Sequence, residues 1–541
     1  MLIDSFCVNG SWTVDYPLFL LRGTFLCHSG CHPTTVTKSR SIFFKTPSKI
    51  APEIFFKTLI SLDTGSNDAS VCCPHISYNF RINRVPTDDT RPYVRCVYVV
   101  FSGHDGSFQA PPNVPSDSGS ACRRLGLAVR LLQTLTAETI FAETGHRRTF
   151  VCAGDLSASS RLQPRVDASP VSAAVWCIQS RISFHEAQNL PPLRLWECLA
   201  RELDVIFWED RGRAKWLALA SCTEFRPMTS FKMMPTSYEE ELVAWHLSDQ
   251  ARCTHGQKAS RRLVHACQIH QRLTGGSIST IVDIGIQGNI FEDFYPSGTY
   301  WANYTTALGT MLHELGHCFD LDHNFEGIMR RGGDDLNLVL AFPPPGSSSL
   351  PEKVQNEYSF RRLSIFQFSG VTFYENVLQV TENAQNQSEI FWGRCVSIGN
   401  CGRAFWRKEV AQFLSFHRWF IESPKSMEGC ETVLKDGILK SPAGIRLLQV
   451  RISEDISSPN LIKLWNLTRH SSAPELPLDA SLMQGCIVYH KLFGKSQKRL
   501  PITKILHNAF SRLKVPTLKV AVLDSNGYVF QKTISNDCLK R

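Results

Sequence analysis

The sequence predicts a multidomain protein of mixed α/β and α+β class, in which β-rich domains flank a larger central domain. The first observation is length: 541 residues exceed what one hydrophobic core usually serves, so about three or four domains are expected. The second is that strand and helix patterns alternate between residues 93 and 222, as in an α/β sheet. The third is that strand patterns dominate residues 1–90 and the chain after residue 443.

The two ends of the chain form the predicted β-rich domains, at residues 1–90 and 426–541. The first is rich in Phe, Ile, Thr and turn residues, and we interpret it as β-sandwich-like. Between the alternating runs of the second, Ser525, Asn526 and Gly527 indicate a tight hairpin turn. The clearest strands expected in the two domains are 16–25, 41–44, 56–61, 445–452 and 518–533.

The central domain is predicted to cover residues 91–425. Runs of β-branched and aromatic residues indicate buried strands, and apolar residues at helical spacing indicate helices. Strands are expected at 93–101, 150–152, 173–178, 216–222 and 277–286. Helices are expected at 120–143, 193–203, 304–319 and 405–420. Residues 236–272 also have a helical pattern, and we interpret 235–275 as an insertion; the Pro- and Ser-rich stretch 341–351 is a linker.

Composition and charge are those of a soluble globular protein. Hydrophobic residues make up 43% and charged residues 20% of the chain. The net charge of +9 is mild for this length, and the basic residues are scattered, with only short clusters such as 495–499. We therefore expect a solvated basic surface and no nucleic-acid partner.

Targeting features also bear on the setting of the protein. The N-terminus lacks the pattern of a secretory signal, and no window reaches the length needed to span a bilayer. The 19 cysteines are dispersed and odd in number, which favours reduced, buried thiols. A cytoplasmic location and no membrane span are expected; the sequence does not indicate an oligomeric state.

The informative motif is His-Glu-X-X-His at residues 313–317, within the predicted helix 304–319. Residues four apart on a helix lie about 40° apart around its axis, so His313 and His317 can reach one metal ion. Glu314 lies about 100° from His313, where it can hold a metal-bound water. Neutral imidazoles suit zinc, and a three-ligand site leaves a position open for water. An apolar stripe on another side of the helix is expected to pack on the core: Leu308, Leu312, Leu315 and Phe319.

The motif continues with a third histidine, His323, six residues beyond His317, and with Gly327-Ile328-Met329. The whole pattern, HExxHxxxxxH followed by a methionine turn, resembles the metzincin clan of zinc metallopeptidases. More narrowly, it resembles a family of zinc metalloproteinases of fungi and animals, and the resemblance covers about half of the chain. It implies a metzincin-like catalytic domain, with a mixed sheet and an active-site helix. It also implies one catalytic Zn²⁺ held by His313, His317 and His323, with Met329 beneath the metal.

One residue departs from the metzincin pattern, because Asp320 occupies the position of its glycine. Glycine serves there because the chain leaves the helix sharply, often through a left-handed conformation. Aspartate tolerates that conformation better than most residues. The departure leaves Asp320 or Asp322 open as alternatives to His323 as the third ligand, with His323 preferred. His417, on the predicted helix 405–420, is either a second-layer partner of the site or a hydrogen-bonded core histidine.

These residues predict a zinc-dependent endopeptidase that acts on a peptide or protein substrate. Glu314 is expected to act as general base, taking a proton from a zinc-activated water and passing it to the leaving amine. The alternative is a zinc-binding protein of the same fold that has little activity and serves as a binding or scaffold module. A zinc hydrolase of non-peptide amides or esters is a third interpretation, because its chemistry at the carbonyl is the same.

Overall fold

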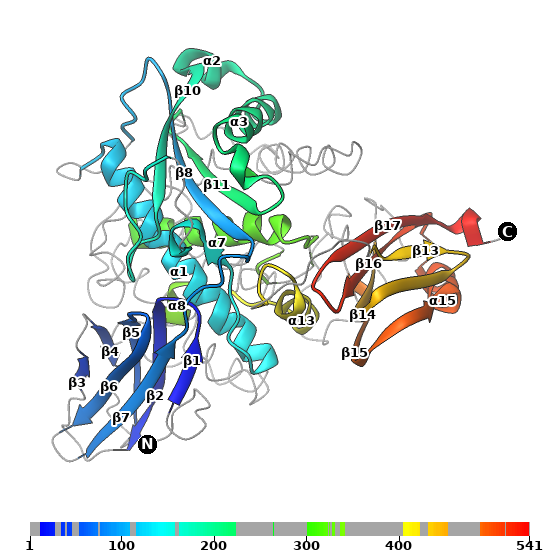
Figure 1. Ribbon diagram of the computed structural model, residues 1–541, viewed down its shortest axis with the longest axis horizontal. Helices are drawn as coiled ribbons and strands as arrows, with labels where there is room; N and C mark the ends of the chain where they lie inside the picture. The colour runs from blue at the N-terminus through cyan, green and yellow to red at the C-terminus, as the bar shows by residue number, and fades with distance from the viewer. Residues whose placement is uncertain are drawn as a thin grey trace, which may run out of the picture. The chain divides into compact units, whose positions relative to one another are not determined.

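The computed structural model describes much of the chain, and its described residues fall into two compact units (Figure 1). The first unit comprises Met1–Leu135, Val151–Cys318 and Leu336–Ser388, and the second comprises Thr136–Phe150, Phe319–Asp335 and Glu389–Arg541. The described residues are 11–26, 34–37, 41–45, 53–73, 76–108, 115–156, 162–222, 263–264, 300–322, 324, 327–329, 336–340, 404–421, 431–452, 487–513 and 515–539.

The N-terminal strands of the first unit form two sheets. One has the order β1-β7-β6-β3 and the other the order β2-β5-β4. The two sheets meet at aromatic side chains, since the Trp12 ring of the first lies 5.7 Å from the Phe19 ring of the second. The strands expected at 16–25, 41–44 and 56–61 are confirmed. The strand bounds are β1 Ser11–Val14, β2 Leu18–Leu26, β3 Thr34–Thr37, β4 Ser41–Lys45, β5 Glu53–Ser61, β6 Gly65–Cys73 and β7 Ile76–Arg84.

A second group of strands in the first unit forms a parallel sheet. Its order is β10-β8-β11-β12, and β9 also pairs with β8. Parallel strands of one sheet need crossover connections, which α1 provides between β8 and β9, and α2 with α3 between β10 and β11. This is the α/β arrangement that alternating strands and helices predict. The bounds are β8 Tyr93–Ser102, α1 Ser118–Thr144, β9 Val151–Cys152, η1 Ala153–Asp155, β10 Val175–Ser183, α2 Phe184–Asn189, α3 Pro192–Ile206, η2 Trp208–Asp210, β11 Ala214–Ala220 and β12 Leu263–Val264.

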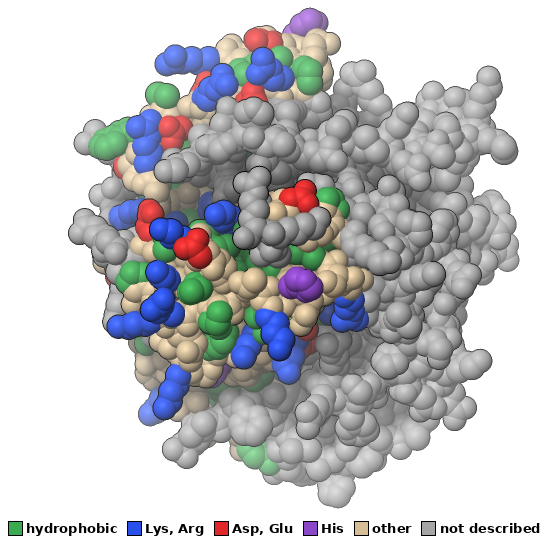
Figure 2. Space-filling view, turned by 90° about the vertical axis from the view of Figure 1, so that its right-hand side faces the viewer, with side chains coloured by type: hydrophobic (Ala, Val, Ile, Leu, Met, Phe, Trp, Pro, Cys, Tyr) green, Lys and Arg blue, Asp and Glu red, His purple; other side chains and the backbone are tan. Residues whose placement is uncertain are grey.

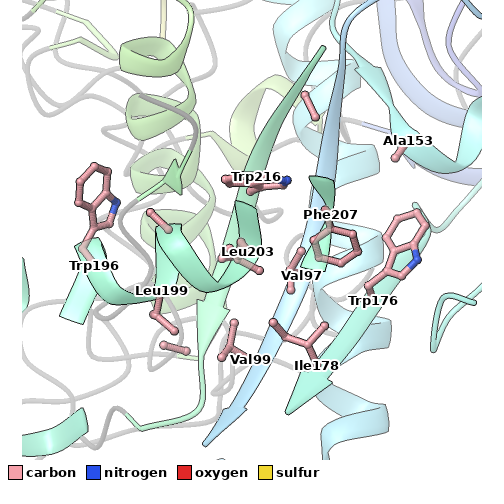
Figure 3. Packing of buried hydrophobic residues seen from close by; sticks show 14 of the residues in the cluster. Val97, Val99, Ala153, Trp176, Ile178, Trp196, Leu199, Leu203, Phe207 and Trp216 are labelled. Atoms are coloured by element: carbon pink, nitrogen blue, oxygen red, sulfur yellow. The ribbon is translucent and has the colours of Figure 1, made fainter. Parts of the chain in front are cut away.

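Helices cover both faces of this parallel sheet. Because side chains alternate along a strand, Trp176 and Ile178 of β10 face one side and Cys177 faces the other. On the first side, α3 packs its apolar residues against the sheet, as Figure 3 shows for Leu199 and Leu203. On the second side, Cys177 is hydrogen-bonded to the thiol of Cys122 on α1. The sheet is therefore buried on both faces, which explains why β8 is an almost uninterrupted apolar run.

A buried carboxylate ties the parallel sheet together. Asp210 is fully buried and accepts hydrogen bonds from Arg95 Nε at 2.5 Å, from the Tyr93 hydroxyl at 2.7 Å and from Trp216 Nε1 at 2.9 Å. Burial alone would lower the pKa of Arg95, but its hydrogen bonds to Asp210 and the charge of that carboxylate raise it. The pKa of Tyr93 rises to about 12, through burial first and the Asp210 charge second. Arg95 and Asp210 therefore form a buried ion pair in which both carboxylate oxygens are hydrogen-bonded.

The helix predicted at 236–272 is wrong at the two of its residues that the structure describes. Leu263 and Val264 form the strand β12, which pairs in parallel with Trp216 and Leu217 of β11. The rest of that stretch, and the strand expected at 277–286, lie outside the described residues. A helical spacing of apolar residues cannot exclude a short strand, since short apolar runs are ambiguous between helix and strand.

Helix α1 also corrects an expectation. Its length and composition are sufficient to cross a membrane, whereas the sequence was expected to contain no such window. However, 83% of its most apolar stretch is buried inside the protein. Its Arg130 forms an ion pair with Asp155 at 2.6 Å, and the guanidinium is also buried. The apolar side chains of α1 are thus accounted for by burial inside the protein. Free thiols among the described residues are Cys96, Cys122, Cys152, Cys177, Cys198, Cys222 and Cys318.

The second unit contains an antiparallel sheet of order β13-β14-β16-β17, with β15 also paired to β14. The hairpin expected at 525–527 is confirmed: β16 and β17 are antiparallel, and Gly527 in the turn has a φ of 82°. Helix α15 buries Leu506, Phe510 and Leu513 against the sheet. Neither β15 nor α15 was expected from the sequence. The bounds are β13 Val433–Lys435, β14 Ile438–Ile452, β15 Ile487–Pro501, α15 Thr503–Leu513, β16 Thr517–Asp524, β17 Val529–Ser535 and η6 Asn536–Leu539.

The helix predicted at 405–420 is shorter in the structure. Helix α13 covers Lys408–Phe416, and the described residues before it, 404–407, are not helical. Phe405 and Trp406 are buried, which explains their apolar character, and the Phe405 carbonyl accepts a hydrogen bond from the amide of Ile328. At the other end, His417 is extended, with φ −74° and ψ 143°.

Basic side chains are dispersed on the face of the described residues that Figure 2 shows. Figure 2 shows Lys and Arg side chains in several separate groups, with acidic side chains among them.

Candidate functional site

The His-Glu-X-X-His motif lies on α7, which covers Tyr300–Cys318. The helix is predicted from its apolar stripe, and Leu308, Leu312 and Leu315 are all buried, as expected. His313 and His317 lie on the other side and are only partly buried. Packing of the apolar face therefore fixes the helix and leaves the two imidazoles accessible.

The two imidazole rings converge. Their Nε2 atoms lie 3.1 Å apart, and the ring planes are at 87° to each other. Two ligands of a tetrahedral zinc ion lie about 3.3 Å apart when the Zn–N bonds are about 2.0–2.1 Å. The observed spacing therefore fits two ligands of one ion, and it also permits an N–H···N hydrogen bond between neutral rings. The expectation that these two side chains can reach one ion is supported by this geometry.

Glu314, the predicted general base, is buried, with 4% of its surface exposed. A carboxylate that is withdrawn from water beside two histidines is a common setting for proton transfer. Among the described residues, no group of three or more His, Cys, Asp or Glu side chains meets as a metal site. His323, the predicted third ligand, lies outside the described residues, and its role stays a prediction.

Asp320, where the sequence departs from the metzincin pattern, has a φ of 64°. This is the left-handed conformation for which glycine is ordinarily selected, two residues after α7 ends at Cys318. The aspartate side chain tolerates this conformation better than most others. The sharp exit from the helix is thus retained without glycine at this position.

Both alternative carboxylate ligands are engaged with other side chains. Asp320 Oδ2 lies 3.3 Å from Nε2 of His417. Asp322 Oδ2 accepts from Arg451 Nη1 at 2.8 Å, and its Oδ1 accepts from Lys519 Nζ at 2.7 Å. Burial alone would raise the pKa of Asp322, but the charges of Lys519 and Arg451 hold it well below its usual value. The structure thus places Asp322 in ion pairs.

His417 is almost fully buried, with 1% of its side chain exposed. Its ring packs near Phe413, with ring centroids 5.6 Å apart, and near Phe420 at 6.4 Å. Because it also contacts Asp320, it is a core histidine with a polar partner in the loop that follows α7. The core-histidine interpretation is thus confirmed, and a second-layer role toward the metal stays a prediction.

Residues 327–329, at the predicted methionine turn, form a bend and turn in the structure, and the place of Met329 beneath a metal stays a prediction. Met329 is buried, and its carbonyl accepts a hydrogen bond from the amide of Asn324 at 3.0 Å. Gly327 has a φ of 72°, and a Cβ added there would lie 2.5 Å from the carbonyl oxygen of Phe405. Only glycine fits that position, so the turn is specified by its sequence.

Arg451, Lys519 and Gln531 contact the loop after α7 but were not identified from the sequence. Arg451 and Lys519 hold Asp322, and Gln531 Nε2 donates to the carbonyl of Asp320 at 3.3 Å. One feature of the sequence could have pointed to Arg451. It is a basic residue at the apolar end of a predicted strand, between Val450 and Ile452. A buried charge in such a run requires a partner, but the sequence does not show which.

Known proteins are similar to this chain in sequence. The profile of the family Metallopep, described as "Putative peptidase family", matches residues 3–246 and 284–402, which together are more than half of the chain. A Schizosaccharomyces pombe protein described as "Putative zinc metalloproteinase" is 21% identical over 378 residues, or 67% of this chain. The matched region is 58% of that relative's length, so under two thirds of the relative is covered.

Solved structures give a looser likeness. A catalytically inactive OgpA from Akkermansia muciniphila, in complex with an O-glycopeptide substrate, is 14% identical, with a TM-score of 0.36 over 84% of this chain and 96% of that one. Wild-type OgpA from the same organism is also 14% identical, with a TM-score of 0.37 over 84% and 95% of the two chains. Since the family profile spans most of the chain and includes the His-Glu-X-X-His helix, the chain belongs to the Metallopep peptidase family.

Proposed function

We propose that the chain is a zinc-dependent endopeptidase of the metzincin type. The observation that carries this proposal is the convergence of His313 and His317 on one helix, with their Nε2 atoms 3.1 Å apart and the buried Glu314 between them in sequence. Membership of a peptidase family supports hydrolysis of a peptide bond as the reaction. The left-handed backbone at Asp320 supports the metzincin type, because that clan leaves its active-site helix through such a conformation.

His313, His317 and His323 would hold the metal. Neutral imidazole nitrogens suit zinc, and three protein ligands leave one position open for water or substrate. When bound, zinc would make that water acidic and would polarise the scissile carbonyl. Fixing two of the ligands on one packed helix reduces the rearrangement that metal binding requires.

Glu314 would move the proton. It accepts a proton from the attacking water as the oxygen bonds to the scissile carbonyl carbon, and it then donates that proton to the amine as the C–N bond breaks. The carboxylate returns to its starting state, so the cycle consumes one water and releases a carboxylate and an amine. Its burial supports this role, because a carboxylate with 4% of its surface exposed is largely shielded from bulk solvent while it carries the proton.

The alternative of an inactive zinc-binding scaffold rested on Asp320. Its backbone retains the conformation that glycine supplies elsewhere, so the substitution gives no geometric reason for lost activity. The enzyme is therefore the better-supported function.

The test compares the wild type with Glu314→Gln, a change that keeps the shape of the side chain but removes the base. We expect about one zinc per chain in both proteins, when the metal content of the purified proteins is measured by mass spectrometry. An unbiased peptide library should be cleaved by the wild type and at least about a hundredfold more slowly by the variant. Zinc in both proteins without cleavage by either would support the scaffold, and a wild type without zinc would refute the metal assignment.

A further inference from the structure

Two basic residues lie directly opposite each other on neighbouring strands of the C-terminal sheet. Arg451 of β14 is the register partner of Lys519 of β16. Their side chains are largely withdrawn from water, with 2% and 18% exposed. Like charges at such positions repel each other, and buried charges need partners. This face of the sheet is therefore suited to receive an anion.

Asp322 supplies that anion, and each of its two oxygens accepts from one of the two cations. Charge-assisted bonds of this length are among the stronger hydrogen bonds in proteins. The pairing also requires a specific position of the carboxylate, because the two donors come from different strands. It thus fixes where residue 322 lies relative to the sheet.

Asp320, two residues before Asp322, is also held by this sheet. Arg451 Nη1 also donates to the carbonyl of Asp320 at 3.0 Å, and Gln531 Nε2 donates to the same oxygen. His417, after α13, contacts the Asp320 carboxylate. We call Arg451, Lys519, Gln531 and His417 the exit clamp, because together they hold the residues through which the chain leaves α7.

The guanidinium at the centre of the clamp is itself oriented. Gln449 Oε1 accepts from Arg451 Nε at 2.9 Å and from Nη2 at 2.7 Å. The amide of Gln449 donates in turn to the carbonyl of Glu409 in α13. The orientation of Arg451 Nη1, which donates to the loop, is therefore fixed by a hydrogen-bond network that extends through Gln449 to α13.

The chain is also held after position 323. The amide of Asn324 donates to the Met329 carbonyl, and the amide of Ile328 donates to the Phe405 carbonyl, both at 3.0 Å. Described contacts thus restrain the backbone on each side of the third histidine of the motif.

We propose that the C-terminal sheet positions the loop that carries the predicted third ligand, with Arg451 and Lys519 as positioning residues that set how tightly the chain holds zinc. This inference rests on the proposed function. A ligand loop that is already fixed loses less conformational freedom when the metal binds. Partners that orient metal ligands without touching the ion typically contribute about 10- to 100-fold in affinity.

The test uses the full-length protein and changes the more exposed cation of the clamp. Lys519→Met removes the charge and keeps most of the side chain, Lys519→Arg keeps the charge, and Lys532→Met is a matched control on β17, where the side chain is exposed. Zinc affinity is measured by competition with a chelator, and the unfolding midpoint of the zinc-free protein is measured alongside. The cobalt-substituted proteins are compared by their d–d absorption, which reports the ligand geometry.

We expect Lys519→Met to weaken zinc binding about tenfold or more and to alter the cobalt spectrum. Lys519→Arg and Lys532→Met should stay close to the wild type. Asp322→Asn, which removes the charge from the loop side, should weaken binding similarly, and the double variant Lys519→Met with Asp322→Asn should lose little more than either alone. Non-additive losses would show that both act through one contact, whether or not either change also lowers stability.

Two results would overturn the inference in distinguishable ways. If the wild type binds one zinc and Lys519→Met and Asp322→Asn bind it equally tightly, the clamp does not set metal affinity, while the proposed function stands. If the wild type binds no zinc, the proposed function fails and the clamp fails with it. Equal weakening in Lys532→Met would also reject the clamp, since it would reflect the overall charge of the sheet.

Discussion

At the scale of single residues, Asp320 shows how a departure from a family pattern can keep the geometry that the pattern serves. The backbone at this position requires φ near 64°. Most side chains with a Cβ clash with the following carbonyl in that region, and aspartate is one of the exceptions. The side chain also contacts His417, and the carbonyl accepts from the C-terminal sheet. Backbone conformation, rather than residue identity, is thus what this position preserves.

Substitutions at Asp320 test this account. Asp320→Gly should change the free energy of unfolding of the zinc-free protein by no more than about 1 kcal/mol, because the relieved strain offsets the lost contact with His417. Asp320→Val should destabilise it by about 1–2 kcal/mol or more, because a β-branched residue resists the left-handed region. Urea denaturation measures both. A valine variant as stable as the glycine variant would contradict the assigned φ.

At the scale of elements, strongly periodic segments could be predicted from the sequence. Helices α1 and α7 and strand β8 follow from their apolar spacing, because each packs one or both faces on a core. The start of α13 could not be predicted from apolar spacing. Phe405 and Trp406 continue the apolar pattern because they are buried, but they lie outside the helix, where the Phe405 carbonyl accepts from the amide of Ile328. Strand β12 was mistaken for helix because short apolar runs are ambiguous between the two.

Helix α7 divides structural and chemical roles between its two sides, and this division can be measured. Leu315→Ala, at a fully buried position, should lower the free energy of unfolding of the zinc-free protein by about 2–5 kcal/mol. His317→Ala, at a partly buried position, should lower it by about 1 kcal/mol or less and should abolish stoichiometric zinc binding. Urea denaturation in the presence of a chelator measures the stability of both zinc-free variants. Metal analysis of the purified proteins measures their zinc content. A large loss of zinc-free stability in His317→Ala would mean that this histidine is structural.

At the scale of the whole molecule, the residues that complete the loop after α7 are far away in sequence. The motif itself, residues 313–329, could be recognised because its chemistry depends on local spacing. The partners of Asp322 could not, since Arg451 and Lys519 come 129 and 197 residues later. Their meeting depends on strand register in the C-terminal sheet, which only the folded chain fixes. The C-terminal sheet therefore belongs to the same compact unit as residues 319–335.

The second unit should also respond to acid through one partly buried histidine, His490. His490 Nε2 lies 2.8 Å from Gln412 Oε1, and its Nδ1 lies 3.2 Å from Gln449 Nε2, an arrangement that suits a neutral ring with one donor and one acceptor. Burial lowers the pKa of His490 below its ordinary 6.5. The unfolded chain therefore binds the proton more readily, so stability present above about pH 6.5 is lost as pH falls through the lower folded-state pKa. We expect the unfolding midpoint of the second unit to decrease between about pH 7 and 5, and His490→Gln to flatten that decrease. Thermal unfolding of the wild type and the variant across this range measures it; an unchanged slope in the variant would assign the acid sensitivity to other groups.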